Sequence, residues 1–344
     1  MNYVPRQAVW ELTLTCNMSC LHCGSRAGKS RNNELTLDEC LDIAQQLIDL
    51  GLEYITLIGG EIFTHKDWHI IARKFVDAGV STNIITNAYL MGDRQLEQLK
   101  KSGIEMVGIS LDGMEETHNK IRGKKDSFQR VDYALTKLKQ EGFKTSIITT
   151  VLDMNVDELE DMYKFIEAHD VYAWQIQLAN PMGNASDHVE FLIDPKRVPG
   201  IIKFIREKKE LGKVRVIPGD CVGYFDENEE AIRGYNKVNA PFSGCGAGLC
   251  VIGLDSVGNV KGCESLYDDK FIEGNLRNES LKKIWTKEGN FAYNRGFTPD
   301  KVTGHCAGCD KASVCAGGCR SMSYFTTGNY YDNPYCCYRL SKNC

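Results

Sequence analysis

The stretch LTLTCNMSCLHCGSRAG, residues 12–28, places three cysteines within eight residues, directly after alternating apolar and polar residues that predict a β-strand. Cys16, Cys20 and Cys23 have the spacing C-x3-C-x2-C, which lets a short loop wrap one face of a four-iron cluster. Such a cluster needs four ligands, so three thiols leave one iron open. An open coordination position distinguishes a catalytic metal centre from a structural one. The alternative is a zinc site completed by His22 or a remote thiol.

Downstream of this loop, short β-branched runs alternate with amphipathic helical segments as far as about residue 213. The expected strands cover residues 8–15, 54–60, 81–87, 106–113, 144–152 and 172–180. The expected helices cover residues 35–51, 65–79, 93–103, 126–142, 156–170 and 197–212. This alternation predicts right-handed βαβ units and a parallel sheet. Because about eight units close a TIM barrel, six predict an open, partial (β/α)6 barrel with its active site at the carboxyl ends of the strands.

The texture of the chain changes after residue 213, where Gly, Asn, Asp and Cys become frequent and only residues 281–289 keep a clear helical pattern. Ten of the fifteen cysteines lie within residues 245–344. A segment so poor in continuous apolar pattern does not readily bury a core of its own, and metal binding would supply folding free energy instead. We therefore expect a barrel over residues 1–213 and a cysteine-rich domain over residues 214–344.

Charge and hydropathy exclude several classes of protein. The net charge is −5, from 41 basic and 46 acidic residues that are well mixed, so no basic stripe suggests nucleic acid as a partner. No stretch approaches the roughly 18 apolar residues of a membrane span, and the first ten residues lack the pattern of a signal peptide. The sequence thus predicts a cytoplasmic protein, in which clustered thiols indicate metal ligation before disulfides.

The cysteine loop, the motif GGE after the second strand and the motif ISLDG after the fourth together resemble the radical S-adenosylmethionine (radical SAM) superfamily, over roughly residues 8–213. In that family the open iron binds the amino and carboxylate groups of S-adenosylmethionine, whose reductive cleavage gives a hydrogen-abstracting 5′-deoxyadenosyl radical. The resemblance implies that Gly59 and Gly60 let the backbone approach the methionine amino group, and that Glu61 forms a salt bridge with it.

Further cofactor contacts are implied by the same resemblance. Asn87 and Ser110 end the third and fourth strands, where relatives carry polar residues that face the cofactor. Either Arg122 or Arg130 would reach the cofactor carboxylate. His22 stands where relatives often have an aromatic residue, and its backbone would touch the adenine. For Asn87, Ser110 and both arginines, the alternative is an ordinary polar residue at a strand end or on the surface.

The C-terminal cysteines spell C-x12-G-x4-C, then C-x2-C-x5-C-x3-C, and a final Cys336–Cys337 pair. This grid resembles the SPASM domain of peptide-modifying radical enzymes, which implies two auxiliary four-iron four-sulfur clusters and three clusters in all. The first auxiliary cluster would take Cys245, Cys250, Cys263 and Cys319. The second would take Cys306, Cys309, Cys315 and Cys336, with Cys337 as the alternative to Cys336. Two four-cysteine zinc sites are the competing interpretation.

The remaining candidate is Glu264, which directly follows Cys263. In sulfatase-maturing relatives an aspartate beside the equivalent cysteine accepts a proton from the substrate. A carboxylate beside a cluster and an apolar cavity has a raised pKa suited to a catalytic base. A solvated loop glutamate is the alternative. Cys40 has the pattern of a small core residue, whereas Cys221 and Cys344 fit no ligand spacing.

Three functions are compatible with these features. The resemblance first implies a radical enzyme that modifies a ribosomal peptide by a thioether or carbon–carbon crosslink or by oxidation. The second is a sulfatase-type maturase that oxidises Cys or Ser to formylglycine, and the third is a zinc-dependent interaction module. A peptide maturase needs an electron donor such as flavodoxin or ferredoxin. Because the first strand begins by residue 8, we expect the leader peptide to be read by the barrel, by the cysteine-rich domain or by a separate partner protein.

Overall fold

The computed structural model describes residues 3–219, 221–233 and 244–342. Its first six strands are parallel, and each is hydrogen-bonded to the next one along the chain. These strands are β1 (Gln7–Glu11), β2 (Tyr54–Ile58), β3 (Ser81–Thr86), β4 (Met106–Ser110), β5 (Lys144–Val151) and β6 (Ala173–Leu178). All six predicted strands are present, and each ends earlier than its hydropathy pattern suggested.

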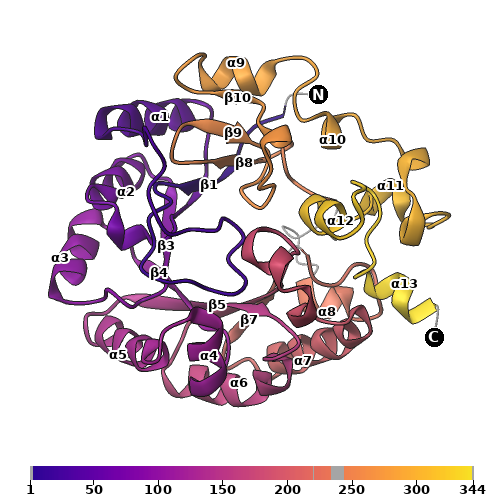
Figure 1. The fold of residues 1–344 in the computed structure, drawn as a ribbon, viewed down its shortest axis with the longest axis horizontal. Coiled ribbons are helices and arrows are strands. Elements are labelled where there is room, and N and C mark those ends of the chain that lie inside the picture. The colour runs from indigo at the N-terminus through magenta and orange to yellow at the C-terminus, as the bar shows by residue number, and fades with distance from the viewer. Residues whose placement is uncertain (1–2, 220, 234–243, 343–344) are drawn as a thin grey trace.

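Helices connect these strands and cover the outer face of the sheet (Figure 1). They are α1 (Leu37–Asp49), α2 (Trp68–Asp77), α3 (Asp93–Ser102), α4 (Glu115–Arg122), α5 (Ser127–Gln140), α6 (Leu159–Ala168) and α7 (Val198–Leu211). Only α4 has no counterpart in the sequence prediction. The start of α1 shows why these boundaries are readable, because Thr36 and Glu39 form a reciprocal capping box there.

The sheet continues on both sides of the six-strand array. At one edge β7 (Arg215–Pro218) pairs in parallel with β6. At the other edge β8 (Val251–Leu254) pairs in parallel with β1, followed by the short antiparallel strands β9 (Asn259–Lys261) and β10 (Gly274–Asn275). Over the described residues the result is a ten-stranded α/β sheet in the order β10-β9-β8-β1-β2-β3-β4-β5-β6-β7. The partial barrel is confirmed, and the cysteine-rich segment adds strands to its open edge.

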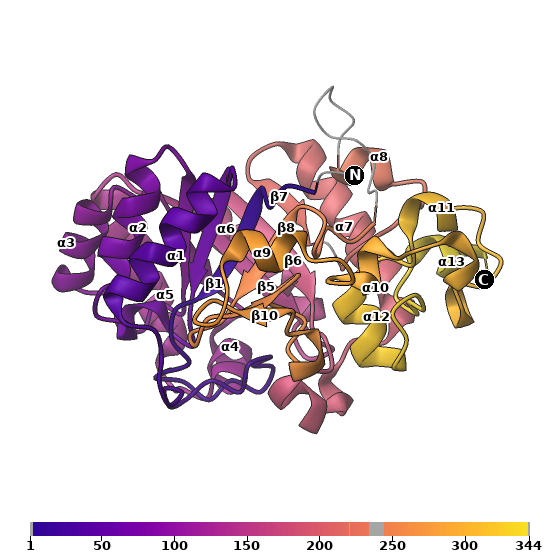
Figure 2. The same cartoon turned by 90° about the horizontal axis from the view of Figure 1, so that it is seen from above.

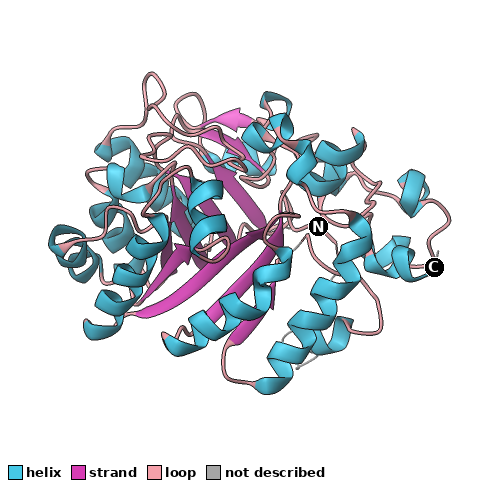
Figure 3. Cartoon of the chain, turned by 60° about the horizontal axis from the view of Figure 1, so that its bottom comes forward, coloured by secondary structure: helices cyan, strands magenta, loops and turns pink. Residues whose placement is uncertain are grey.

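The two faces of the sheet have different environments. Figure 3 shows that the strands curve and that the helices pack against the outer face. On β1, Trp10 points outward and is fully buried, with an edge-to-face ring contact to Phe75 of α2. Side chains alternate along a strand, so Val9 and Glu11 point to the inner face. On the inner face of β4 to β6, Gly108 and Ala173 are buried, and the half-buried residues are mostly polar: Met106, Ser110, Ser146, Ile148, Thr150, Gln175 and Gln177. The inner face over β4 to β6 is therefore partly exposed and mostly polar, whereas on β1 Glu11 is buried.

The C-terminal segment consists of short helices and turns beside the barrel (Figure 2). Its helices are α8 (Glu229–Arg233), α9 (Leu281–Thr286), α10 (Ala292–Arg295), α11 (Ala312–Cys315), α12 (Arg320–Thr327) and α13 (Cys337–Lys342). Polar anchors hold this region, as at buried Arg320, which donates to the carbonyls of Tyr293, Ala316 and Gly318. In the part of the chain that the structure describes, no helix combines the length and apolarity of a bilayer span.

Candidate metal centres and cofactor site

The loop after β1 gathers its three cysteines at the carboxyl end of the sheet. Its base is closed by two backbone hydrogen bonds, from Cys16 to the Gly28 carbonyl and from Gly28 to the Leu14 carbonyl, both 3.0 Å. Burial, together with the neighbouring Cys20 and Cys23 thiols, raises the pKa of the Cys16 thiol to about 12. A thiol whose pKa is raised in this way ionises readily only with a cation beside it, which is the chemistry of a metal centre.

The glycines of the GGE motif are required by the approach of the cysteine loop. A Cβ on Gly60 would lie 2.5 Å from the Thr15 carbonyl oxygen and 2.6 Å from that of Leu14. The backbone N–H of Gly60 donates to the Thr13 carbonyl at 2.7 Å, and a Cβ on Gly59 would meet the same oxygen at 3.0 Å. A close backbone crossing directly before Cys16 therefore requires both glycines, and the approach of a methionine amino group to them stays a prediction.

Glu61 is fully buried and already engaged with the ends of β2 and β3. Its carboxylate accepts hydrogen bonds from Thr86 Oγ1 (2.6 Å), the Asn87 backbone N–H (2.7 Å) and the Phe63 backbone N–H (3.1 Å). Burial raises the pKa of Glu61, and these donors oppose the shift. The structure thus uses this carboxylate to fix Asn87 beside the cysteine loop, and an ammonium partner would share it with three protein donors.

Asn87 lies beside the cysteine loop, in agreement with its place at the end of β3. Its side-chain nitrogen is 2.9 Å from the Asn17 side-chain oxygen and 3.9 Å from the Cys16 sulfur. Its side-chain oxygen accepts from the backbone N–H of Tyr89 at 3.0 Å. Ser110, the last residue of β4, is half-buried at the inner face of the sheet. Both residues border the concave end of the barrel where the three thiols lie.

Asp112, in the ISLDG motif, is a central site residue that the sequence did not single out. It is fully buried and accepts from His22 Nε2 at 2.8 Å, from Arg122 Nη2 at 2.6 Å and from the Thr150 backbone N–H at 2.9 Å. Arg122, His22 and the nearby His118 hold the pKa of this carboxyl below its usual range despite its burial. An acidic residue at the end of an apolar strand is the signal that could have identified it.

The two candidate arginines have different environments. Arg122 is buried at the end of α4, and its Nη1 lies 3.8 Å from the Cys20 sulfur. Arg130 is a half-exposed residue of α5 whose guanidinium lies over the Tyr89 ring, 5.3 Å from the ring centroid. The structure brings Arg122 into the cysteine cluster and leaves Arg130 outside it, across Tyr89. His22 also acts through its side chain here, whereas its resemblance-based role involved only its backbone.

The first C-terminal thiol set surrounds the start of α12. Burial raises the pKa of Cys319, and the adjacent Cys245, Cys221 and Cys263 raise it further. Cys250 lies in the turn that begins at Cys245, where its backbone N–H donates to the Gly246 carbonyl at 3.0 Å, and its side chain is exposed. Cys221, to which sequence spacing assigned no ligand role, lies near this set, and its sulfur accepts the Leu178 backbone N–H at 3.3 Å. Cys344 lies outside the described residues.

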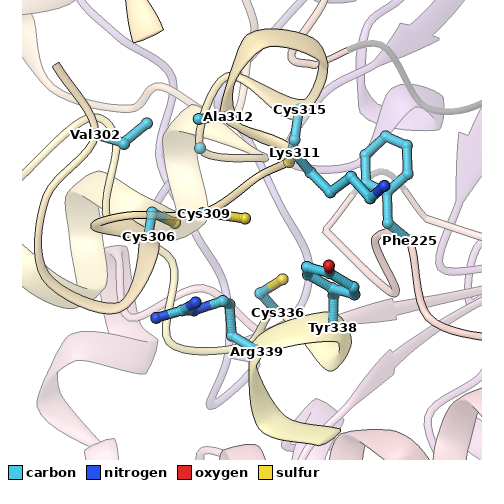
Figure 4. A pocket seen from close by; sticks show the side chains of 11 residues that line it. Phe225, Val302, Cys306, Cys309, Lys311, Ala312, Cys315, Cys336, Tyr338 and Arg339 are labelled. Carbon is cyan, nitrogen blue, oxygen red and sulfur yellow. The ribbon is translucent and has the colours of Figure 1, made fainter. Parts of the chain in front are cut away.

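The second C-terminal thiol set lines one pocket (Figure 4). Its sulfurs belong to the four predicted ligands Cys306, Cys309, Cys315 and Cys336. Lys311, Tyr338 and Arg339 border the same pocket. The neighbouring Cys337 is buried elsewhere, where Asp226 and Glu229 of the α8 region raise the pKa of its thiol beyond the effect of burial. The geometry therefore groups Cys336 with the other three thiols and turns Cys337 away from them.

Glu264 is buried, which removes the alternative of a solvated loop glutamate. Its Oε1 lies 3.0 Å from Lys261 Nζ, while its buried Oε2 has no hydrogen-bond partner among the described residues. Burial raises the pKa of Glu264 against the opposing effect of Lys261. A Cβ on Gly253 of β8 would lie 2.4 Å from the Glu264 nitrogen, and Gly253 pairs with Val9. Glu264 therefore crosses the inner face of the sheet.

The donor sets fit iron–sulfur clusters. Three sets of thiols are present, and sulfur ligands are those that such clusters require. Within the described ranges, no three His, Cys, Asp or Glu side chains converge closely enough to hold a single metal ion. The sulfurs of the second set instead border a common pocket.

Comparison with known proteins identifies the class of this chain. Two family models match it: the radical SAM superfamily over residues 10–166, and SPASM, an iron–sulfur cluster-binding domain, over residues 245–310. An AdoMet-dependent heme synthase from Methanosarcina barkeri is 30% identical over 99% of this chain and 99% of its own length. Mycofactocin maturase MftC from Mycolicibacterium smegmatis is 29% identical over 94% of this chain and 80% of its own.

The fold agrees with these sequence matches. Streptococcus suis SuiB bound to precursor peptide SuiA superposes with a TM-score of 0.78, covering 96% of this chain and 75% of that chain at 16% identity. The barrel with its open thiol triad and the cysteine-rich extension therefore define an iron–sulfur enzyme. The chain belongs to the radical SAM superfamily and carries a SPASM domain.

Proposed function

We propose that this enzyme cleaves S-adenosylmethionine reductively and abstracts hydrogen from a peptide substrate, installing a crosslink or an oxidation during maturation of a ribosomal peptide. The observation that carries the first half is the triad of Cys16, Cys20 and Cys23, one ligand short of a closed cluster and held at the carboxyl end of the parallel sheet, with Cys20 buried and the other two half-buried. When bound, the cluster and S-adenosylmethionine supply a hydrogen-abstracting 5′-deoxyadenosyl radical.

The residues around the triad have separate positioning roles in this proposal. Asn87, held by Glu61, borders the Cys16 side of the loop, and Ser110 borders the inner face of β4. Arg122, oriented by Asp112, supplies fixed positive charge beside Cys20, where it favours bound carboxylate or thiolate. The glycines at 59 and 60 admit the backbone crossing that sets the height of the loop above the sheet.

A peptide as substrate is supported by the shape of the inner face and by the relatives. The concave surface presents half-buried polar side chains such as Thr150, Gln175 and Gln177, which can pair with peptide amide groups. One structural neighbour is bound to a precursor peptide, and one sequence relative is a maturase. A separate leader-binding partner remains part of the proposal.

Together with the N-terminal triad, the two C-terminal thiol sets would give the proposed enzyme three four-iron clusters and a route for electrons. The second set lies at a pocket beside Lys311 and Arg339. An electron donor such as flavodoxin or ferredoxin is required to reduce the catalytic centre. Chemistry that depends on so many unoxidised thiols favours a reducing compartment, and we assign the enzyme to the cytoplasm.

Glu264 is the proposed base of the reaction. Its unpaired Oε2 can take a proton from the substrate while Lys261 orients Oε1. Formylglycine formation on a protein Cys or Ser would use the same carboxylate in the same way, and it is the nearest alternative within the peptide class.

Anaerobic reconstitution followed by mass spectrometry tests this proposal. The reconstituted protein is expected to hold about twelve iron and twelve sulfide per chain, for three four-iron clusters, and to form 5′-deoxyadenosine with dithionite. Incubation with candidate precursor peptides should then give a mass loss that depends on S-adenosylmethionine. Stoichiometric zinc, or no 5′-deoxyadenosine, contradicts the proposal, and formylglycine on a sulfatase peptide redirects it to the maturase alternative.

A second candidate substrate is a heme precursor, because the heme synthase relative matches over the whole length of both chains. The same assay with an iron porphyrin in place of peptide distinguishes the two. If the enzyme converts the porphyrin and does not modify the peptides, the heme precursor replaces the peptide as the proposed substrate.

A further inference from the structure

Residues 180–187, the first part of the connection between β6 and α7, contact the cysteine loop, as seen where the indigo N-terminal loop meets them in Figure 1. The backbone N–H of Asn184 donates to the Cys23 carbonyl at 2.8 Å, and the Asn184 side-chain amide donates to the Cys20 carbonyl at 2.9 Å. Two of the three thiol-bearing residues are thus fixed by one asparagine. Arg26 and Asp187 add an exposed ion pair across the same contact.

Glycines on both sides allow this contact to be unusually close. Gly183 has φ +58°, and a Cβ there would lie 2.3 Å from the carbonyl oxygens of both Cys23 and Gly24. On the opposite side, a Cβ on Gly24 would lie 2.5 Å from the terminal methyl group of Met182. Gly183 faces backbone atoms and has no room for a side chain, whereas Gly24 faces only the flexible end of Met182, so Gly183 is the position that the close contact requires.

The other end of the connection reaches the SPASM domain. The Asn180 side-chain amide donates to Ser321 Oγ of α12 at 2.8 Å, and Ser321 Oγ donates to the Ser265 carbonyl at 2.6 Å. Ser265 is next to Glu264 and two residues from Cys263. A continuous path of backbone and hydrogen bonds therefore runs from the Cys20–Cys23 turn to the segment that carries the proposed base.

We infer that residues 180–187 form a strap that positions the cysteine loop and couples it mechanically to the Cys263–Ser265 segment. The inference rests on the proposed function for the identity of the bound cofactor, although the strap itself is defined by contacts within the chain. Asn184 is its positioning residue toward the cofactor loop, and Ser321 is its anchor on the SPASM domain. Coupling between two sites through a contiguous bonded path is testable by perturbing either end.

The decisive experiment compares Gly183→Ala with Gly212→Ala in the reconstituted enzyme. Both glycines have positive φ, +58° and +69°, but a Cβ on Gly212 meets nothing within 4 Å. The pair therefore shares the backbone strain and differs only in the clash with the cysteine loop. Gly183→Ala is expected to weaken S-adenosylmethionine binding by about tenfold or more, a loss of about 1.4 kcal/mol, and to raise amide hydrogen exchange in residues 16–28. Gly212→Ala should leave both measurements at their wild-type values.

Ser321→Ala tests the contact of the strap with the SPASM domain. Asn184→Asp tests its contact with the cysteine loop, because the variant keeps the size of the side chain but loses the amide donor to the Cys20 carbonyl. Ser321→Ala is expected to raise exchange in residues 16–28 as well as in residues 263–267. If Gly183→Ala behaves as Gly212→Ala does, or if Ser321→Ala changes only the nearer segment, the strap is refuted. Should the wild type bind no S-adenosylmethionine, the proposed function fails, while the exchange data still decide on the strap.

Discussion

Asp112 and Arg122 form a buried ion pair, with Oδ2 and Nη2 separated by 2.6 Å, next to the cysteine loop. The same carboxylate binds the His22 imidazole, so one acidic residue after β4 orients a residue between two thiols and an arginine beside the Cys20 sulfur. Removing one partner of a buried pair leaves an uncompensated charge, which makes this pair the most sensitive polar contact of the site.

Asp112→Asn should destabilise the fold and loosen the cysteine loop together. We expect the free energy of unfolding to fall by about 3–5 kcal/mol, the usual cost of breaking a buried pair, as measured by anaerobic denaturant titration. Asp153→Asn is the matched control, because Asp153 forms an exposed ion pair with Arg197. Equal small losses in the two variants would show that the buried pair contributes little.

Cys16→Ala should remove one cluster and spare the others. The expected iron content falls from about twelve to about eight per chain, and 5′-deoxyadenosine formation is abolished. Cys40→Ala serves as the control, because Cys40 is buried in α1 among apolar side chains. Retention of all the iron in Cys16→Ala would rule out this thiol as a ligand.

Cys336→Ala and Cys337→Ala should differ, although the residues are adjacent. Cys336 lines the pocket of the second C-terminal thiol set, whereas Cys337 packs toward α8. We expect only Cys336→Ala to lose about four iron and the electron paramagnetic resonance signal of one auxiliary cluster. The reverse outcome would make Cys337 the ligand.

His118 should make stability depend on pH. Burial and the nearby Arg122 lower the pKa of His118 to about 3, and its Nδ1 accepts the Asp112 backbone N–H at 3.0 Å. A neutral imidazole is thus kept in the folded state, while the unfolded chain binds a proton below its ordinary pKa of 6.5. The stabilisation is complete above that pH and is lost as the pH falls, by about 1 kcal/mol between pH 6.5 and 5.5.

The comparison that checks this is wild type against His118→Asn, whose side-chain oxygen can still accept the Asp112 N–H. Denaturant midpoints at several pH values should show a shallower acid slope in the variant. His188→Asn, at a half-exposed imidazole, provides the control slope. Parallel slopes in all three proteins would mean that His118 titrates normally.

Most of the barrel could be predicted because its strands and helices follow local sequence patterns. The features that were missed depend on contacts between residues far apart in the sequence. The capping box at Thr36 and Glu39 lies within one helical turn, so sequence alone reveals it. The cluster at Asp112 needs three elements to converge, and no spacing rule connects residues 22, 112 and 122. The clash that requires Gly60 likewise depends on a chain crossing from the loop after β1.

The cysteine-rich part shows the same limit. Thiol spacing indicated which cysteines belong together, but Cys221, far from either cluster in sequence, reaches Cys319 only through the fold. Helix α12 has no readable apolar stripe, because buried Arg320 and Ser323 occupy it and are satisfied by backbone carbonyls and neighbouring groups. Cysteines that bind metal and polar side chains that bond backbone carbonyls produce no periodic hydropathy pattern in the sequence.

The parallel pairing of β8 with β1 has a consequence for how such an enzyme can be divided. Residues Gln7 to Trp10 exchange backbone hydrogen bonds with β2 on one side and with Val251 to Leu254 on the other. A fragment that ends after the barrel would lack β8 and leave one edge of β1 unpaired. Such an exposed strand edge can pair with another chain and cause aggregation. The barrel and the SPASM domain thus share one sheet. Exchanging SPASM domains between enzymes requires that the β1–β8 pairing, which supports the cysteine loop, forms again.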